Sequence, residues 1–547
     1  MTRDRPSYDE ASVRAARQVV EALRASDLRR ANELSNRAIL DGLRHPALFN
    51  ARAIFSEASG RIEDALADFK RTRSYVPDDA NLLLSIGLCL LKLGRASEAV
   101  DVFDAASVIK PSSPAVDRYR ADALMAIGDS EAASQAYEKA IAVDPKDAKA
   151  LASLAALALR RDETSRAREL ATRSLTLYPG NLSATLTMAN AELVERQFVS
   201  AERRLRALLA RDLDPLQRTA ALSMLGDALD GTDDTKHAFE AYSTSKAELR
   251  QIYTPQFVNG RAIDAANALI ELFEAMPAGR WASVESAQGV ESSGPRAHIF
   301  LLGFMRSGTT LLELALASHP DVVVMDEHDL LRDTNQTFLT SAEGIEQLAD
   351  LGQEEISRRR SDYWAAVGAK GIATAGRVFV DKLPFHTAKL PIIAKLFPEA
   401  KILFCLRDPR DVVFSSFRRP FEVNATIFEF LSLENGARFY DSIMRLASIY
   451  RRKLPLEVHD HRYEAMVENF EESLSAVCDF IGIAWNEKMR AFGEAAKTIV
   501  IRNPSAAQVR RPLNSEGIGQ WRRYREQMAP IIPLLAPWVA AFGYPAD

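Results

Sequence analysis

Two arginine-containing turns in the second half of the chain have the residue types needed to bind an anion. In the first, GFMRSGTTLLE, Gly303 and Gly308 flank Arg306, and a helix is expected to begin near Thr309. Backbone N–H groups at such a helix start bind phosphate-like anions. The spacing GxxxxG matches a Walker A loop, but Thr309 stands where that loop has its lysine. The motif argues against an ATPase or kinase, and taken alone it fits an ordinary structural turn equally well.

The second turn is LRDPRDVVFSSFRR, which begins with Arg407. Ser415 follows eight residues later, and Arg419 follows Ser415 at i+4. This spacing predicts that the hydroxyl and the guanidinium share one helix face, with Arg407 able to close over the same anion. A ligand with two phosphate ends would satisfy both turns. The alternative is a solvated basic helix in which Asp408 forms a salt bridge.

Both turns belong to a region in which short apolar runs alternate with helical segments. The runs are HIFLL, DVVVM, RVFV, KILFCL and a weaker PLEVH. This alternation predicts an α/β domain with a mostly parallel sheet. Ligands of such sheets gather beyond the carboxyl ends of the strands, so the residues that follow the runs are the candidate site. In chain order these residues are Arg306, Glu327, Lys382, Arg407 and Tyr463.

The first half of the chain is a repeat array with a period of 34 residues. Three registers share this period: Pro77, Pro111, Pro145 and Pro179; Ala65, Ala99, Ala133, Ala167 and Ala201; and Gly60, Gly94 and Gly128. Each unit predicts a helical hairpin in which glycine ends one helix and proline the next. The pattern resembles the tetratricopeptide repeat over about residues 30–245, and it weakens where Asp162 and Arg196 replace the glycine. Such arrays often bind a peptide or partner protein on a concave face; a scaffold or dimerisation arm is the alternative.

Composition limits the class of protein. The chain has 547 residues, a net charge of −5 and three widely spaced cysteines. The cysteine spacing argues against a disulfide framework and a zinc site and favours a folded protein in a reducing compartment. The mild negative charge argues against nucleic-acid binding over the whole chain. No run of about 18 apolar residues and no signal peptide is recognised, so neither a membrane span nor export is expected.

The ordered motifs of the second half resemble a known family. GFMRSGTT, HPDVVVMDE, VDKLPF, LFPEAKILFCLRDPRDVVFSSFRR, RYEAMVENFEESLSAVCDFIGIAWN and a final WRRY look like a sulfotransferase that uses 3′-phosphoadenosine 5′-phosphosulfate, and most resemble tyrosylprotein sulfotransferases. We therefore expect a tetratricopeptide solenoid with capping helices at 1–275, a linker at 276–297, and a P-loop-like sulfotransferase domain at 298–547.

The resemblance implies a role for each matching residue. Arg306, Ser307, Gly308, Thr309 and Thr310 would hold the 5′-phosphosulfate; Arg407, Ser415 and Arg419 would hold the 3′-phosphate; Tyr463 would face the adenine, helped by Ser505. Glu327 matches the general base, and Lys382 matches the lysine at the transferring sulfuryl group. A fixed cation stabilises charge developing on the bridging oxygen without a metal, and a phenol with a pKa near 10 needs a carboxylate to take its proton.

Departures from the family pattern leave alternatives open. Asp329 stands where the family has an arginine on the acceptor side, which puts an acidic-peptide preference in doubt. His328 and His386 are alternative bases, although a solvated or hydrogen-bonded histidine is the more common reading. A protein or peptide tyrosine is the expected acceptor, with a carbohydrate or small-molecule hydroxyl as the first alternative and an inactive scaffold as the second. The repeats without an anchor indicate a bacterial, cytoplasmic protein, with a homodimer as one arrangement considered.

Overall fold

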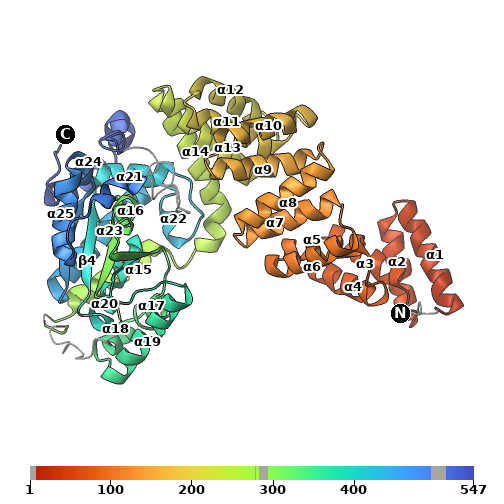
Figure 1. Cartoon of the computed structure of the whole chain (residues 1–547), viewed down its shortest axis with the longest axis horizontal. Helices are drawn as coiled ribbons and strands as arrows, with labels where there is room; N and C mark the ends of the chain where they lie inside the picture. The colour runs from red at the N-terminus through yellow and green to blue at the C-terminus, as the bar shows by residue number, and fades with distance from the viewer. Residues whose placement is uncertain (1–7, 278, 282–293, 494–512) are drawn as a thin grey trace. The chain divides into compact units, whose positions relative to one another are not determined.

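The computed structural model describes residues 8–277, 279–281, 294–493 and 513–547 (Figure 1). The chain divides into two compact units, Met1–Leu208 and Leu209–Asp547. Within the described residues, no helix has both the length and the apolar character needed to cross a membrane.

The first unit is built from helical hairpins. After α1 (Glu10–Arg24) and α2 (Leu28–Leu40), the hairpins are α3 (Pro46–Ala58) with α4 (Ile62–Tyr75), α5 (Ala80–Lys92) with α6 (Ala96–Ile109), α7 (Pro114–Ala126) with α8 (Ser130–Val143), α9 (Ala148–Arg160) with α10 (Thr164–Leu177), and α11 (Leu182–Val194) with α12 (Phe198–Leu209). The first helix of each pair begins 34 residues after its predecessor, at positions 46, 80, 114, 148 and 182. The structure therefore confirms the period predicted from the sequence.

The conformation of the turns inside the hairpins explains how two repeats form the same hairpin without a glycine at this position. Gly60, Gly94 and Gly128 adopt φ values of +76°, +72° and +86°, and Asp162 and Arg196 take the same left-handed conformation at +62° and +59°. Asp is among the residues that tolerate this region best, and for Arg it costs more. The turn geometry is kept, and the alanines of the second helices (65, 99, 133, 167 and 201) are fully buried between neighbours.

The second unit starts upstream of the boundary expected at residue 275. It opens with α13 (Pro215–Gly231), α14 (Thr235–Tyr253), η1 (Thr254–Phe257) and α15 (Ala262–Ala275). The fully buried Glu429 shows why α15 belongs here: its carboxylate accepts hydrogen bonds from Arg261, at 2.5 Å from Nη2. The expected linker, 276–297, lies partly outside the described residues. Its described Trp281 is buried with its ring 5.9 Å from that of Phe273.

A five-stranded parallel sheet follows, as the apolar runs predicted. Its strands are β1 (Ala297–Gly303), β2 (Val322–Asp326), β3 (Val378–Lys382), β4 (Lys401–Leu406) and β5 (Glu457–Arg462), in the order β2-β3-β1-β4-β5. From β1 the chain first builds one side of the sheet and then crosses to β4 on the other side. The loops after β1 and β4 therefore flank the switch point at which parallel sheets bind ligands.

Helices cover the sheet and carry the chain between its strands. They are α16 (Thr309–Ala317), α17 (Arg332–Phe338), α18 (Ala342–Ala349), α19 (Gln353–Ala369), η2 (Pro384–Lys389), α20 (Leu390–Leu396), α21 (Pro409–Arg418), α22 (Ala425–Glu429), α23 (Leu433–Lys453), α24 (Tyr463–Glu468), α25 (Phe470–Ile481), η3 (Glu487–Ala491), η4 (Gln520–Tyr524), α28 (Arg525–Met528) and α29 (Ile532–Ala541). One core packs α16 and α25 against β1, β3 and β4.

Candidate active site

The residues predicted after the five strands lie at one edge of the sheet, in the order of the strands. Glu327 follows β2, Lys382 ends β3, Arg306 lies in the loop after β1, Arg407 follows β4, and Tyr463 follows β5. The strand register supports this arrangement, because Asp326 at the end of β2 is paired with Lys382 at the end of β3. Polar residues from five separate segments therefore share one edge.

The loop between β1 and α16 has the backbone of an anion-binding turn. Arg306 adopts φ +66° and Gly308 φ +92°, so the chain turns sharply before α16 begins at Thr309. A side chain at Gly308 would meet the Tyr463 ring at 2.7 Å, which explains the need for glycine. Three of the predicted ligands are buried here: Ser307 in the loop, and Thr309 and Thr310 at the start of α16.

Arginines join the β1 and β4 loops. Arg306 Nε donates to Ser415 Oγ at 3.1 Å, and Arg407 Nη1 donates to the Arg306 carbonyl oxygen at 2.9 Å. Burial, and after it the charges of Arg419, Arg407 and Arg418, lower the pKa of Arg306 to about 9. Among the described residues, the Nε atoms of Arg407, Arg418 and Arg419 have no hydrogen-bond partner. A cluster of arginines that repel one another, three of them with an Nε unpartnered within the part of the chain that the structure describes, is suited to a multiply charged anion.

Helix α21 corrects one sequence expectation. It ends at Arg418, and Arg419 is its C-cap residue with an extended backbone (φ −79°, ψ 141°), so Ser415 and Arg419 do not share a helix face. The cause is Pro420, because the residue before a proline is driven out of the helical region. The helix is also buried rather than solvated, and Asp408 both caps it and pairs with Arg410 at 2.8 Å.

Lys382 lies at the centre of three carboxylates. Its fully buried ammonium is 2.8 Å from Glu327 Oε1 and 3.0 Å from Glu313 Oε2, and it also contacts Asp326. Burial opposes the charge of Lys382, but the carboxylates outweigh burial and raise its pKa. Burial raises the pKa of Glu313 to about 7 despite the nearby lysine. Glu327 is the exposed carboxylate of the three, on a left-handed residue (φ +44°).

The acceptor-side departure, Asp329, is paired within the protein. Lys389 Nζ contacts Asp329 Oδ1, and Arg332 Nε lies 3.7 Å from Asp329 Oδ2. Its negative charge is therefore largely balanced, which weakens the argument that Asp329 repels acidic acceptors.

The remaining predicted residues fall into different environments. His386 is fully buried with Nε2 3.5 Å from Asp381, whereas His328 is exposed beside Glu327. The guanidinium of Arg407 lies 4.8 Å from the centre of the half-buried Tyr463 ring. Ser505 lies outside the described residues.

Sequence reasoning missed three residues that support the site. Glu313 is the single charge within the apolar run TLLELALA, a signal that it is buried on a core-facing helix. Asp411 accepts hydrogen bonds from the N–H groups of Gly519 and Trp521, at 2.6 and 2.9 Å, and so holds the carboxyl-terminal segment beside Arg407. Lys246 reaches the site from α14, and no local pattern marks it.

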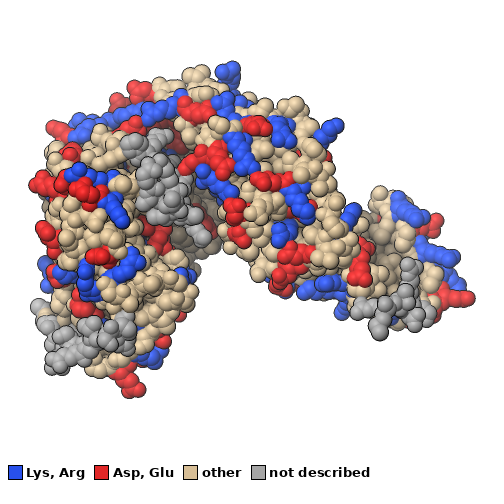
Figure 2. All heavy atoms as spheres, in the orientation of Figure 1, with Lys and Arg blue, Asp and Glu red and all other residues tan. Residues whose placement is uncertain are grey.

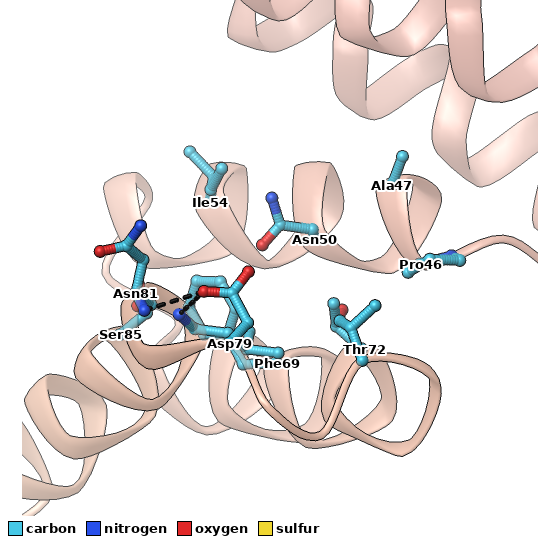
Figure 3. Close-up of a pocket in the computed structure, with 11 residues that line it drawn as sticks. Pro46, Ala47, Asn50, Ile54, Phe69, Thr72, Asp79, Asn81 and Ser85 are labelled. Carbon is cyan, nitrogen blue, oxygen red and sulfur yellow. Dashed lines mark hydrogen bonds between the residues drawn. The ribbon is translucent and has the colours of Figure 1, made fainter. Parts of the chain in front are cut away.

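The repeat region contains a separate pocket of about 340 Å³ between α3, α4 and α5. Figure 3 shows Asn50, Ile54, Asp79 and Ser85 around it, with Asp79 Oδ1 accepting hydrogen bonds from the N–H groups at the start of α5. On the face drawn in Figure 2, basic and acidic side chains are interspersed.

Comparisons with known proteins match two separate regions of the chain to two different families. The tetratricopeptide repeat model matches residues 56–114 and 120–181, and the sulfotransferase family model matches residues 298–487. The chain thus carries tetratricopeptide repeats followed by a sulfotransferase-family domain.

The relatives differ in how much of their length is shared. Protein-tyrosine sulfotransferase 1 of Danio rerio is 27% identical over 262 residues, which cover 45% of this chain and 72% of that protein. Protein-tyrosine sulfotransferase A of Caenorhabditis elegans is 25% identical over 299 residues, covering 52% and 75%. An uncharacterized protein of Aquifex aeolicus is 23% identical over 246 residues, covering 43% of this chain and 32% of its own length. A solved tetratricopeptide repeat protein from Parabacteroides merdae covers 44% of this chain and 94% of its own at 13% identity, with a TM-score of 0.37.

Proposed function

We propose that the protein transfers a sulfuryl group from 3′-phosphoadenosine 5′-phosphosulfate to an acceptor hydroxyl, most favourably that of a tyrosine in a protein or peptide. The observation that carries the proposal is the order of residues along the sheet edge. Glu327 and Lys382 lie at the ends of β2 and β3, and the arginine cluster lies next to them, after β1 and β4. This order matches an acceptor, a transferring group and a nucleotide arranged in a line.

The arginine cluster fits the donor. Arg306 and the start of α16 would hold the 5′-phosphosulfate, and Arg407, Ser415 and Arg419 the 3′-phosphate. Two anionic ends would relieve the repulsion that lowers the Arg306 pKa. The donor supplies the activated sulfuryl group, and the charge that develops on its leaving oxygen would be stabilised by Lys382.

Glu327 suits the general base because it combines exposure with a fixed position. Its backbone N–H donates to the Lys382 carbonyl oxygen at 2.8 Å, and its carboxylate contacts the Lys382 ammonium. An incoming hydroxyl would transfer its proton to Glu327 as it attacks. The names of the relatives support a tyrosine acceptor, and the repeats would raise its local concentration by binding the polypeptide that carries it.

The test measures transfer of labelled sulfate from the donor to tyrosine peptides, sugars and small alcohols. Glu327→Gln should lower turnover by about two orders of magnitude while donor affinity is retained. Asp326→Asn is the matched control, because it removes another carboxylate from Lys382 without removing the exposed base. If Glu327→Gln kept its activity, His328 would replace Glu327 as the candidate general base. Transfer to sugars or alcohols alone would refute the tyrosine acceptor, and failure to bind the donor nucleotide would refute the function.

A further inference from the structure

A helical hairpin outside the sheet domain reaches the proposed phosphate site. Lys246 on α14 is buried, with 3% of its surface exposed, and its Nζ donates to the backbone carbonyl oxygen of Arg419 at 2.8 Å. Asp227 on α13 lies on the other side of the same arginine, with Oδ2 3.7 Å from Arg419 Nη1. The hairpin therefore contacts both the backbone and the guanidinium of Arg419.

These contacts compensate for the way α21 ends. Arg419 is in an extended C-cap, where helix carbonyl groups lose their partners and the backbone is free to vary. The Lys246 ammonium satisfies the Arg419 carbonyl and fixes that residue in place. Burial lowers the pKa of Lys246 to about 8, a cost that the negative charge of Asp227 reduces.

The Asp227 contact leaves Arg419 able to bind a ligand. Asp227 Oδ1 accepts a hydrogen bond from the buried Tyr242 hydroxyl at 2.7 Å, so the carboxylate is itself held in position. Its distance of 3.7 Å from Arg419 is too long for a hydrogen bond. The carboxylate thus attracts and orients the guanidinium without using its donors, and Arg419 Nε has no hydrogen-bond partner among the described residues.

A neighbouring contact on the same hairpin provides a comparison. Asp230 accepts hydrogen bonds at 2.6 Å from both the Tyr524 hydroxyl and Arg523 Nη1, and it also lies 3.3 Å from Arg418. It anchors α13 to the carboxyl-terminal segment without touching Arg419. Loss of Asp230 would therefore weaken the attachment of the hairpin in general.

We propose that Lys246 and Asp227 are positioning residues of the donor site, which fix the backbone and guanidinium of Arg419 for the 3′-phosphate. The last helical hairpin before the sheet is then part of the nucleotide site. This inference rests on the proposed function.

The experiment compares two nucleotides by calorimetry on the full chain: 3′,5′-diphosphoadenosine, and adenosine 5′-monophosphate, which lacks the 3′-phosphate. Lys246→Met should weaken binding of the diphosphate roughly 10- to 100-fold, the range for losing a hydrogen bond to a charged group, and change monophosphate binding less than about twofold. Lys246→Arg should restore part of the difference. Asp227→Asn should give a smaller selective loss in the same direction.

Asp230→Asn is the matched control, and it should affect both nucleotides equally. If Lys246→Met weakened the binding of both nucleotides equally, or of neither, the lysine would be structural and the proposal would be overturned. If Lys246→Met fails to fold, Asp227→Asn decides by the same comparison. A native chain that binds neither nucleotide would instead overturn the proposed function, and the inference with it.

Discussion

Glu313 offers a sharp test of the electrostatics around Lys382. Its pKa is raised from 4.5 to about 7 because burial disfavours the charged carboxylate. Between these two values the folded protein keeps a proton that the unfolded chain has released, so stability falls as pH rises through this window. Each pKa unit corresponds to about 1.4 kcal/mol, so the loss amounts to about 3 kcal/mol. Glu313→Gln, which cannot ionise, should avoid this loss.

The assay measures the free energy of unfolding by urea titration from pH 4 to pH 8. Relative to the native chain, Glu313→Gln should gain stability progressively between pH 4.5 and 7 and then level off. Glu355→Gln is the control: Arg358 and Arg359 hold the pKa of Glu355 down at about 2, so its difference from the native chain should be flat above about pH 5.5 and should rise only as pH falls below it, the opposite direction to Glu313→Gln. A flat difference for Glu313→Gln as well would refute the reasoning.

Three further predictions concern binding, folding and the acceptor. Arg407→Ala should weaken 3′,5′-diphosphoadenosine binding by about 100-fold in calorimetry, with or without Mg²⁺, because it removes a guanidinium from a buried anion site. A chain starting at residue 209 should unfold cooperatively in circular dichroism melts, whereas one starting at residue 276 should be less stable by about 3–5 kcal/mol, because it leaves Glu429 buried without Arg261. Asp329→Asn should lower KM for acidic tyrosine peptides a few-fold relative to neutral ones, since it releases the positive charge of Lys389.

The sequence predicted the elements whose signals are local. The period of 34 came from proline, alanine and glycine registers, and the five strands came from apolar runs, because both patterns record which side chains must be buried. The residues after the strands were found for the same reason, since parallel strands bring their carboxyl ends to one edge.

The remaining features depend on contacts distant in sequence or on signals that were overlooked. Lys246 and Arg419 are 173 positions apart, and no periodicity links them. The composition change near residue 276 does not coincide with the division by compactness after Leu208, because α15 is attached to the following helices through side-chain contacts such as Arg261 with Glu429. The end of α21 could have been predicted from Pro420, and the burial of Glu313 from its apolar neighbours.

The position at which the second unit begins has a consequence for how such a chain can diversify. Duplication or loss of whole 34-residue units upstream of Leu209 preserves the packing of every remaining hairpin, because each repeat of a solenoid contacts only its neighbours. Recombination that joins a new array at residue 276 would instead separate the sheet domain from α13, α14 and α15. Viable fusions and engineered chimeras should therefore have their junctions before α13, and the three helices should be inherited together with the sheet.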